Sequence, residues 1–151
     1  MTVTIRPATP DDYAQWRPLW DGYNRFYGRF DATALPEEVT AQTWSRFFDE
    51  AEPLYALVAE EDGKIAGIVH YHFYRSTTLL GDDCYLQDLF TVPARRGKGV
   101  GRKLIEAVYD VARAKGLVRV FWHTHETNAR AQVLYNDVAE RSGFIVYRKM
   151  F

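Results

Sequence analysis

Apolar residues recur along this chain with two different periods, and each period predicts a different kind of element. Between residues 99 and 115 they return every three to four positions, which is the spacing of a helix with one buried face. Lys115 and Gly116 supply a basic last turn and a glycine cap, which predicts where this helix ends. Residues 55–59 and 65–74 are instead runs of apolar, β-branched and aromatic side chains, which predicts two strands.

The same reading extends to the rest of the chain. Asp62-Gly63 between the two strands is typical of a tight hairpin turn, and Thr9, Pro10 and Asp12 have the pattern of a capped helix start. Further strands are expected at residues 3–6, 85–92, 118–124 and 144–150, and further helices at 36–48 and 128–142. This order predicts an α/β fold with a mixed sheet. No repeat or linker divides the chain, so we expect one domain over residues 1–151.

Composition narrows the class of protein. Hydrophobic residues make up 47% of the 151 residues, which is enough for one domain with a single core. The lone cysteine, Cys84, excludes an intramolecular disulfide and favours a reducing compartment. No apolar run approaches the length of a membrane span, and the N-terminus has no signal-like apolar region. We therefore expect a cytoplasmic protein that does not enter a membrane.

The net charge of −1 conceals a separation of charge along the chain. Residues 31–62 hold nine acidic residues and one arginine, whereas residues 95–119 hold eight basic residues and two acidic ones. Either these are ordinary solvated faces, or the basic half binds an anionic cofactor and the acidic half binds a cationic acceptor. Because the chain has no overall basic excess, a nucleic-acid partner is not expected.

The most distinctive chemistry lies in residues 95–101, Arg-Arg-Gly-Lys-Gly-Val-Gly, between a predicted strand and a predicted helix. Three glycines at every second position let backbone N–H groups approach an anion, and the helix N-terminus adds the positive end of its dipole. The ligand should therefore carry phosphate. The spacing does not match a Walker loop, and Arg102 stands where a dinucleotide fingerprint needs its third glycine, so ATP and NAD are disfavoured.

Residues 96–101, which follow the strand sequence Leu-Gln-Asp-Leu-Phe-Thr-Val-Pro, resemble the Arg-x-x-Gly-x-Gly signature of the Gcn5-related N-acetyltransferases, or GNAT family. The resemblance implies a single-domain GNAT fold, with a mixed, mostly antiparallel sheet flanked by about four helices. It also implies acetyl-CoA as co-substrate, with the main chain of Leu89 and Thr91 bonding the pantetheine arm. A backbone N–H at a strand bulge near Leu89 would meet the oxyanion. The residues implied to hold the pyrophosphate are Arg96, Gly97, Lys98, Gly99, Val100, Gly101 and Arg102.

A second motif, Asn-x-x-Ala-x-x-Leu-Tyr at residues 128–135 with Gly-Phe at 143–144, is similar to the GNAT segment beside the thioester. The resemblance implies that Asn128 contacts the cofactor and that Tyr135 directs its hydroxyl at the thioester sulfur as a general acid. Seven residues span two helical turns, so both side chains fall on nearly the same helix face. The competing interpretation is that Tyr135 is a core residue with a hydrated hydroxyl.

The general base has more than one candidate. An alkylamine has a pKa of about 10, so some group must remove its proton at neutral pH. The related spermidine/spermine acetyltransferases carry a glutamate at the position of Gln87, and an amide cannot act as a base. We therefore expect Gln87 to orient an ordered water, with Asp88 or Glu126 as the final proton acceptor. Strand alternation places Asp88 on the face opposite Gln87 unless a bulge rotates it.

The closest resemblance is to the histone/polyamine branch of the family. It implies an acetyl-CoA-dependent N-acetyltransferase that acts on a primary amine, whether a polyamine, a small amine or an exposed lysine. A non-catalytic acyl-CoA sensor and an interaction module on the same fold are the alternatives. Members of that branch associate, so we expect a homodimer formed through the final strand or an exposed aromatic face.

Two His-x-His pairs, His70/His72 and His123/His125, each place both side chains on one face of a strand. Zinc would require the two pairs to converge, and hydrogen-bonded strand histidines are the simpler interpretation, so we expect no metal. The aromatic residues near the N-terminus are interpreted mainly as core residues. Their other interpretation is a surface for the methylenes of a polyamine or a lysine side chain.

Overall fold

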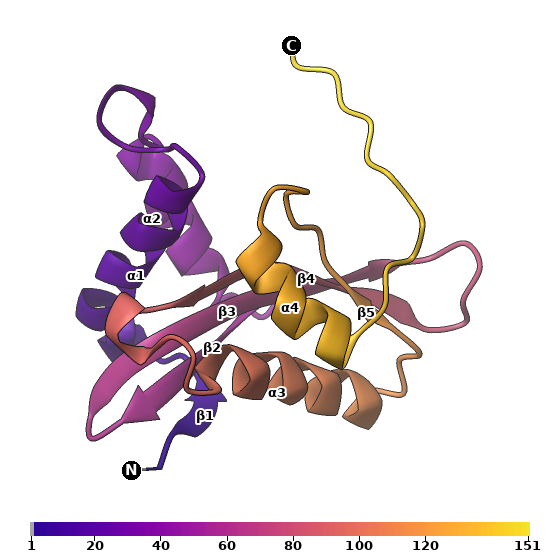
Figure 1. Cartoon of the computed structure of the whole chain (residues 1–151), viewed down its shortest axis with the longest axis horizontal. Helices are drawn as coiled ribbons and strands as arrows, with labels where there is room; N and C mark the ends of the chain where they lie inside the picture. Colours follow the sequence, from indigo (N-terminus) through magenta and orange to yellow (C-terminus); the bar gives the residue numbers. More distant parts are fainter. Residues whose placement is uncertain (1) are drawn as a thin grey trace.

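The hairpin predicted from the two apolar runs forms the centre of the sheet. In the computed structural model, which describes residues 2–151, β2 (Leu54–Glu61) and β3 (Lys64–Arg75) pair antiparallel (Figure 1). The turn between them holds Asp62 and Gly63 at φ angles of 52° and 75°. Two successive positive φ angles belong to a type I′ turn, whose twist matches that of the flanking strands. The predicted hairpin is therefore confirmed.

The other strands extend the sheet in the order β1-β2-β3-β4-β5. β1 (Thr4–Pro7) and β4 (Asp82–Thr91) pair antiparallel with their neighbours, whereas β5 (Val120–Phe121) pairs parallel with β4. The predicted α/β fold, with a mixed, mostly antiparallel sheet, is confirmed. Its helices are α1 (Tyr13–Phe26), α2 (Glu37–Arg46), α3 (Val100–Ala114) and α4 (Ala129–Val138), with 3-10 turns at Pro10–Asp12, Asp31–Thr33 and Pro93–Arg95.

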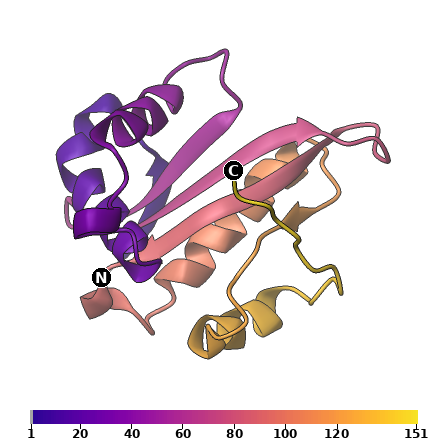
Figure 2. The same ribbon diagram turned by 90° about the horizontal axis from the view of Figure 1, so that it is seen from above.

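Alternating side chains of the sheet build one core on each face, with α1 and α2 covering one face and α3 lying across the other (Figure 2). Trp16 of α1 packs with Ile68 on the first face. Leu104 of α3 packs with Val69 on the second, and the apolar side of α4 lies against that same core. Each large side chain buried in this way contributes about 1.5–3 kcal/mol, so both helical layers are fixed to the sheet.

The predicted helix start at Thr9 is confirmed in its capping contacts. The backbone N–H of Thr9 donates to Asp12 Oδ2 at 2.7 Å, and Arg6 of β1 donates twice to the same carboxylate at 2.8 and 2.9 Å. The Arg6 guanidinium holds the pKa of Asp12 below its usual value. The chain makes one 3-10 turn here and passes directly into α1.

The structure shortens two of the elements predicted for the C-terminal part. The strand expected at residues 118–124 is only two residues long, because only Cys84 and Tyr85 of β4 pair with it. The helix expected at residues 128–142 ends at Val138, because residues 139–142 are exposed and bury no side chain against α3.

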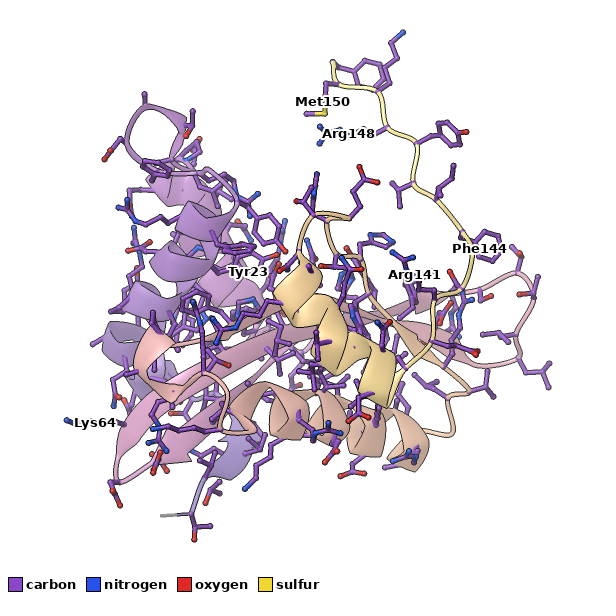
Figure 3. All side chains as sticks on the ribbon, in the orientation of Figure 1. Tyr23, Lys64, Arg141, Phe144, Arg148 and Met150 are labelled. Carbon is purple, nitrogen blue, oxygen red and sulfur yellow. The ribbon has the colours of Figure 1, made fainter. Side chains whose placement is uncertain are left out.

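The final strand predicted at residues 144–150 is wrong. These residues form no strand, and Figure 3 shows Phe144, Arg148 and Met150 along a segment that runs away from the sheet. A strand needs a neighbouring ladder, and the two residues of β5 offer too short an edge for this segment to pair with. The large apolar side chains left exposed are those of Phe144, Ile145, Val146, Tyr147, Met150 and Phe151.

The helices of the structure are short and amphipathic. The longest, α3, has 15 residues. Within residues 2–151, no helix is both long and apolar enough to cross a membrane.

Candidate active site

β4 and β5 diverge after only two paired positions. Cys84 pairs with Val120 and Tyr85 pairs with Phe121, and no later residue of β4 has a strand partner on that side within residues 2–151. The edge of β4 over residues 86–91 is therefore open. An open edge can bind an extended chain through its backbone N–H and C=O groups, as if that chain were another strand. Leu89 and Thr91, the residues expected to bond the pantetheine arm, lie on this edge.

A β-bulge at Gln87 changes the face of the sheet that the following residues occupy. The register of β4 against β3 shifts between Leu86 and Asp88, which makes Gln87 the extra residue. Leu86 and Leu89 both contact the core on the α3 side, so Gln87 and Asp88 between them turn toward α1. The bulge thus reverses the alternation that would have put Asp88 on the opposite face. It lies two residues before Leu89, the position that the resemblance indicated.

Asp88 is held by a buried chain of side-chain hydrogen bonds. His70 of β3, with 1% of its surface exposed, contacts Asp88 Oδ2 through Nδ1 at 2.9 Å and Trp16 Nε1 through Nε2 at 3.0 Å. An indole N–H only donates, so His70 Nε2 accepts and Nδ1 carries the ring proton. We therefore assign His70 Nδ1–H as the donor to the Asp88 carboxylate. Trp16 fixes the tautomer, and the tautomer orients the carboxylate.

A row of aromatic rings along α1 begins at Trp16, the last member of these hydrogen bonds, and extends toward the open edge. Trp16 stacks on Trp20 at 5.5 Å between ring centroids, Trp20 on Tyr23 at 5.8 Å, and Tyr23 meets Tyr27 at 5.0 Å. The Tyr23 hydroxyl donates to the carbonyl of Gln87 at 3.4 Å, on the side of α1 toward α4 (Figure 3). Burial, and next the charge of Asp88, raise the pKa of Tyr23 and of Tyr27 above the ordinary tyrosine value.

The glycine loop after β4 has the backbone geometry of an anion site. Gly97 and Gly99 have φ angles of 75° and 85°, in the left-handed region that favours glycine, and a Cβ at either would meet only open space. The first N–H of α3 that bonds a carbonyl among residues 2–151 is that of Lys103, to Gly99 at 3.0 Å. The N–H groups of residues 100–102 are therefore free to donate outward at the positive end of the helix.

Two arginines predicted to bind the pyrophosphate already have their side chains bonded within the protein. Arg96 Nε donates to the carbonyl of Thr91 at 2.9 Å, which folds its guanidinium back along β4. Arg102 pairs with Asp137 of α4, so its side chain is engaged within the protein. The predicted phosphate contacts of Arg102 thus reduce to its backbone N–H.

Of the other loop residues predicted to bind the pyrophosphate, Lys98 faces solvent and Val100 lies in the core. Lys98 is exposed, and its ammonium is free to meet an anion. Val100 is buried in the core on the α3 side, so only its backbone can reach a ligand. A Cβ added at Gly101 would lie 3.5 Å from the Leu134 side chain, so α4 approaches the start of α3 closely.

Tyr135 reaches the gap between β4 and β5 from α4. Its ring meets Trp122 at 5.4 Å between centroids, and its hydroxyl has no hydrogen-bond partner within the described part of the chain. Burial raises the pKa of Tyr135 to about 12, and the phenol of Tyr27 adds to the shift. Tyr135 therefore keeps its proton throughout the neutral range.

The two remaining predicted residues lie around the start of α4. Asn128 occupies the N-cap position and donates from Nδ2 to Thr124 Oγ1 at 3.3 Å. Glu126 lies exposed on the preceding turn, and no contact joins it to Asp88 within residues 2–151. The structure thus brings Gln87 and Asp88 together, and leaves Glu126 apart from them.

The histidines of the two His-x-His pairs take separate positions. His72 contacts Gln87 Oε1 at 3.0 Å, and His123 contacts the hydroxyl of Tyr85 through Nδ1 at 3.3 Å. His125 contacts Thr127 at 2.7 Å. Among residues 2–151, no group of three or more His, Cys, Asp or Glu side chains could hold a metal ion.

His70 and Trp16 are the site residues that sequence reasoning missed. The residue pattern places them on a strand face and in the core, which their burial agrees with. Their pairing with Asp88 depends on the register of β3 against β4 and on the approach of α1 to the sheet. The residue spacing along the chain carries no signal for either.

Comparison with protein families decides which family this chain belongs to. The model of the family described as "Acetyltransferase (GNAT) family" matches residues 16–139, which include the open edge, the glycine loop and α4. The chain belongs to the GNAT family. The family predicted from the glycine loop and the Asn…Tyr motif is therefore confirmed.

Two relatives of this GNAT chain align with 97% and 67% of it. The D-amino-acid N-acetyltransferase HPA3 of Saccharomyces cerevisiae is 34% identical over 149 residues, which covers 97% of this chain and 90% of the yeast protein. The thialysine N-epsilon-acetyltransferase of Mus musculus is 31% identical over 114 residues, covering 67% and 66% of the two chains. Among solved structures, AAC(6')-Iy with the bisubstrate analogue CoA-S-monomethyl-acetylneamine has a TM-score of 0.83 at 19% identity, covering 100% of this chain and 99% of that one. At that identity the likeness shows a shared fold.

The GNAT assignment also fixes the class of enzyme. The protein is an acyltransferase of a family that transfers acetyl groups to amines, as the sequence predicted. Solved structures that share this fold include AAC(6')-Iy with CoA and with a CoA-based bisubstrate analogue, at 20% and 19% identity.

Proposed function

We propose that this GNAT enzyme, over residues 1–151 as one domain, uses acetyl-CoA to acetylate a primary amine by direct attack on the thioester. The acceptor is a small amine, a polyamine or a lysine side chain. The observation that carries the proposal is the arrangement around the gap between β4 and β5. Asp88 approaches the gap from the α1 side, Tyr135 approaches it from α4, and the glycine loop lies at the end of the same strand.

The residues at this gap fit coenzyme A. The open N–H groups at the start of α3 and the ammonium of Lys98 match a pyrophosphate, and left-handed Gly97 and Gly99 keep side chains out of its path. The open edge at Leu89 and Thr91 matches the amides of a pantetheine arm. Asn128, at the start of α4, is a further candidate contact.

Acetyl-CoA supplies an acetyl group activated as a thioester, with a thiolate as the leaving group. Asp88 receives the proton of the attacking ammonium, directly or through a water that Gln87 orients, so that the nitrogen lone pair can form the C–N bond. His70 is a positioning residue, because it holds the Asp88 carboxylate from the buried side. A backbone N–H near Leu89 stabilises the oxyanion, and Tyr135 acts as general acid by donating a hydrogen bond to the charge that develops on sulfur as the C–S bond breaks. The second proton that the nitrogen loses after attack neutralises the thiolate, so the products are the acetylated amine and the free thiol of CoA.

Tyr135 can act as a general acid only if its hydroxyl already donates a hydrogen bond to the thioester sulfur. Its pKa of about 12 lies well above the value of about 8.5 for a thiol, so complete transfer to a free thiolate is uphill. Stabilisation therefore comes from the hydrogen bond to the developing charge on sulfur. A phenol that remains protonated at neutral pH always has that proton to offer.

The proposed activity is tested by following release of free CoA across a panel of primary amines. We expect release above the rate of thioester hydrolysis with at least one acceptor, and acetylated amine in the same amount. CoA alone should raise the melting temperature, because it binds only the native state. A thermal shift with no release from any amine would instead support an acyl-CoA sensor, and no shift at all would remove coenzyme A from the proposal.

Replacing Gly99 with alanine is expected to weaken CoA binding about tenfold, because an L-residue in the left-handed region costs about 1–2 kcal/mol and the loop relaxes out of the binding conformation. Calorimetric titration with CoA measures this. Gly63→Ala is the matched control, since Gly63 has a φ angle of 75° in the hairpin turn, and it should lower the melting temperature without changing CoA affinity. Equal CoA affinity in the Gly99 variant and the wild type would contradict the proposed binding of the pyrophosphate by the glycine loop.

We also propose that the enzyme is a cytoplasmic homodimer in which the exposed segment at residues 144–151 contacts a second copy. Unpaired apolar residues with high strand propensity favour pairing with another chain. Light scattering should give the mass of a dimer for the whole chain and of a monomer after deletion of residues 144–151. A monomeric whole chain, or a dimer that survives the deletion, would reject this contact.

A further inference from the structure

The end of α1 places one arginine in a fixed position. Gly28, with a φ angle of 78°, ends the helix, and its N–H donates to the carbonyl of Arg25 at 3.0 Å. The N–H of Arg29 donates to the carbonyl of Asn24 at 2.9 Å. These two bonds form a Schellman motif, in which the residue after the glycine is tied back to the last turn. The backbone of Arg29 is therefore positioned by local sequence.

The side chain of Arg29 is anchored as well. Its Nε donates to Asn24 Oδ1 at 2.6 Å, and Asn24 is itself only 4% exposed and donates from Nδ2 to the carbonyl of Trp20 at 2.9 Å. The guanidinium lies 5.4 Å from the ring of Tyr27 and 5.8 Å from that of Tyr23. A single bond through Nε leaves the two terminal nitrogens free, and both have a planar geometry that suits a carboxylate.

Arg29 differs from most arginines of this protein in having no carboxylate partner in the described residues. Its terminal nitrogens make no hydrogen bond there either. The arginines that pair with a carboxylate are Arg6, Arg17, Arg46, Arg75, Arg95, Arg102, Arg113 and Arg119. Half-buried cations are normally paired, so an anchored guanidinium with free donors beside a candidate active site indicates an anionic ligand.

Arg29 and Asp88 lie on two sides of the same tyrosines. Tyr23 presents its ring to Arg29 and its hydroxyl to the backbone of Gln87, next to Asp88. The charge of Asp88 raises the pKa of Tyr27, and the charge of Arg29 lowers it. The phenols thus separate a positive group from a negative one, as a small zwitterion would require of its binding site.

We infer that the acceptor carries a carboxylate, bound by Arg29, in addition to the amine that Asp88 deprotonates. The inference rests on the proposed function and narrows its acceptor class to amino acids and similar amino carboxylates. A monoanion fits better than a phosphate, because the negative end of the α1 dipole adjoins Arg29 and opposes a second negative charge. A polyamine fits poorly, because its second ammonium would meet the guanidinium of Arg29.

The test compares acceptors that differ only in the carboxylate. CoA release is measured with an α-amino acid and with its carboxamide, for the wild type, Arg29→Gln, Arg29→Lys and Arg25→Gln. We expect Arg29→Gln to lower kcat/KM for the amino acid by about 10- to 100-fold, the loss expected for charge-assisted hydrogen bonds, and to leave the carboxamide unchanged. Arg29→Lys should fall between, because it keeps the charge and loses the planar fork. Arg25 is the control, since it lies exposed over Phe30 near the same helix end.

Two results would overturn the inference while leaving acetyl transfer intact. One is a wild type that acetylates the amino acid and the carboxamide equally well. The other is an Arg29→Gln variant that loses both activities to the same extent with an unchanged melting temperature. Calorimetric titration of the amino acid into the enzyme with CoA bound reads the same contact without turnover. Binding that depends on Arg29 in an enzyme that releases no CoA would keep the carboxylate site and reject the proposed reaction.

Discussion

Replacing Asp88 with asparagine is expected to lower kcat by about 10²- to 10⁴-fold, the range in which a positioned general base contributes. Asparagine has nearly the same shape, and its Oδ1 can still accept from His70 Nδ1–H, so the contact to β3 is retained. The group that receives the proton is lost. Steady-state kinetics with the best acceptor of the panel measure the change, with CoA affinity expected to stay the same.

The pH dependence separates a lost base from a general disturbance. Without Asp88, the rate should rise with pH as the fraction of free amine grows toward its pKa of about 10. Asp82→Asn is the matched control, because Asp82 lies on the same strand and pairs with the exposed Arg75 at 3.2 Å. Glu126→Gln tests the other predicted acceptor. A large loss in the Glu126 variant, with Asp88→Asn near wild type, would move the base to the loop before α4.

Replacing Tyr135 with phenylalanine should lower kcat by about tenfold to a thousandfold and change CoA affinity little. The ring keeps its contact with Trp122, so the substitution removes the hydroxyl alone. Because the pKa of Tyr135 is about 12 and the protonated form is the donor, ionisation of this residue should not reduce the wild-type rate below about pH 11. A pH–rate profile of both proteins measures this together with kcat.

Tyr109→Phe distinguishes a chemical role of Tyr135 from a structural one. The Tyr109 hydroxyl donates to the carbonyl of Val138 at 2.9 Å and thereby ties the end of α4 to α3. Removing it should lower stability by about 0.5–1.5 kcal/mol and leave kcat close to wild type. If this variant lost as much activity as Tyr135→Phe, the position of α4 and not the phenol would explain both. Unchanged turnover in Tyr135→Phe would remove Tyr135 from the mechanism.

Much of the fold could be predicted because its signals are local. The Asp62-Gly63 turn, the contacts of Thr9 with Asp12 and the glycine that ends α3 each depend on a few neighbouring residues. The failures lie where an element needs a distant partner. Residues 144–150 have the composition of a strand and no ladder to join, so propensity alone overstated that element.

The amino-acid sequence by itself determined the family, the glycine loop and the order of the elements as far as α4, because loop conformation, helix caps and side-chain period depend on residues that are adjacent in the chain. The tertiary structure decided which groups surround Asp88. His70 is 18 residues away and Trp16 is farther still, and they meet Asp88 only through strand register, the bulge at Gln87 and the packing of α1. A shift of one residue in register would turn Asp88 to the other face of the sheet. That register depends on how side chains pack throughout both cores, and no single motif in the sequence predicts it.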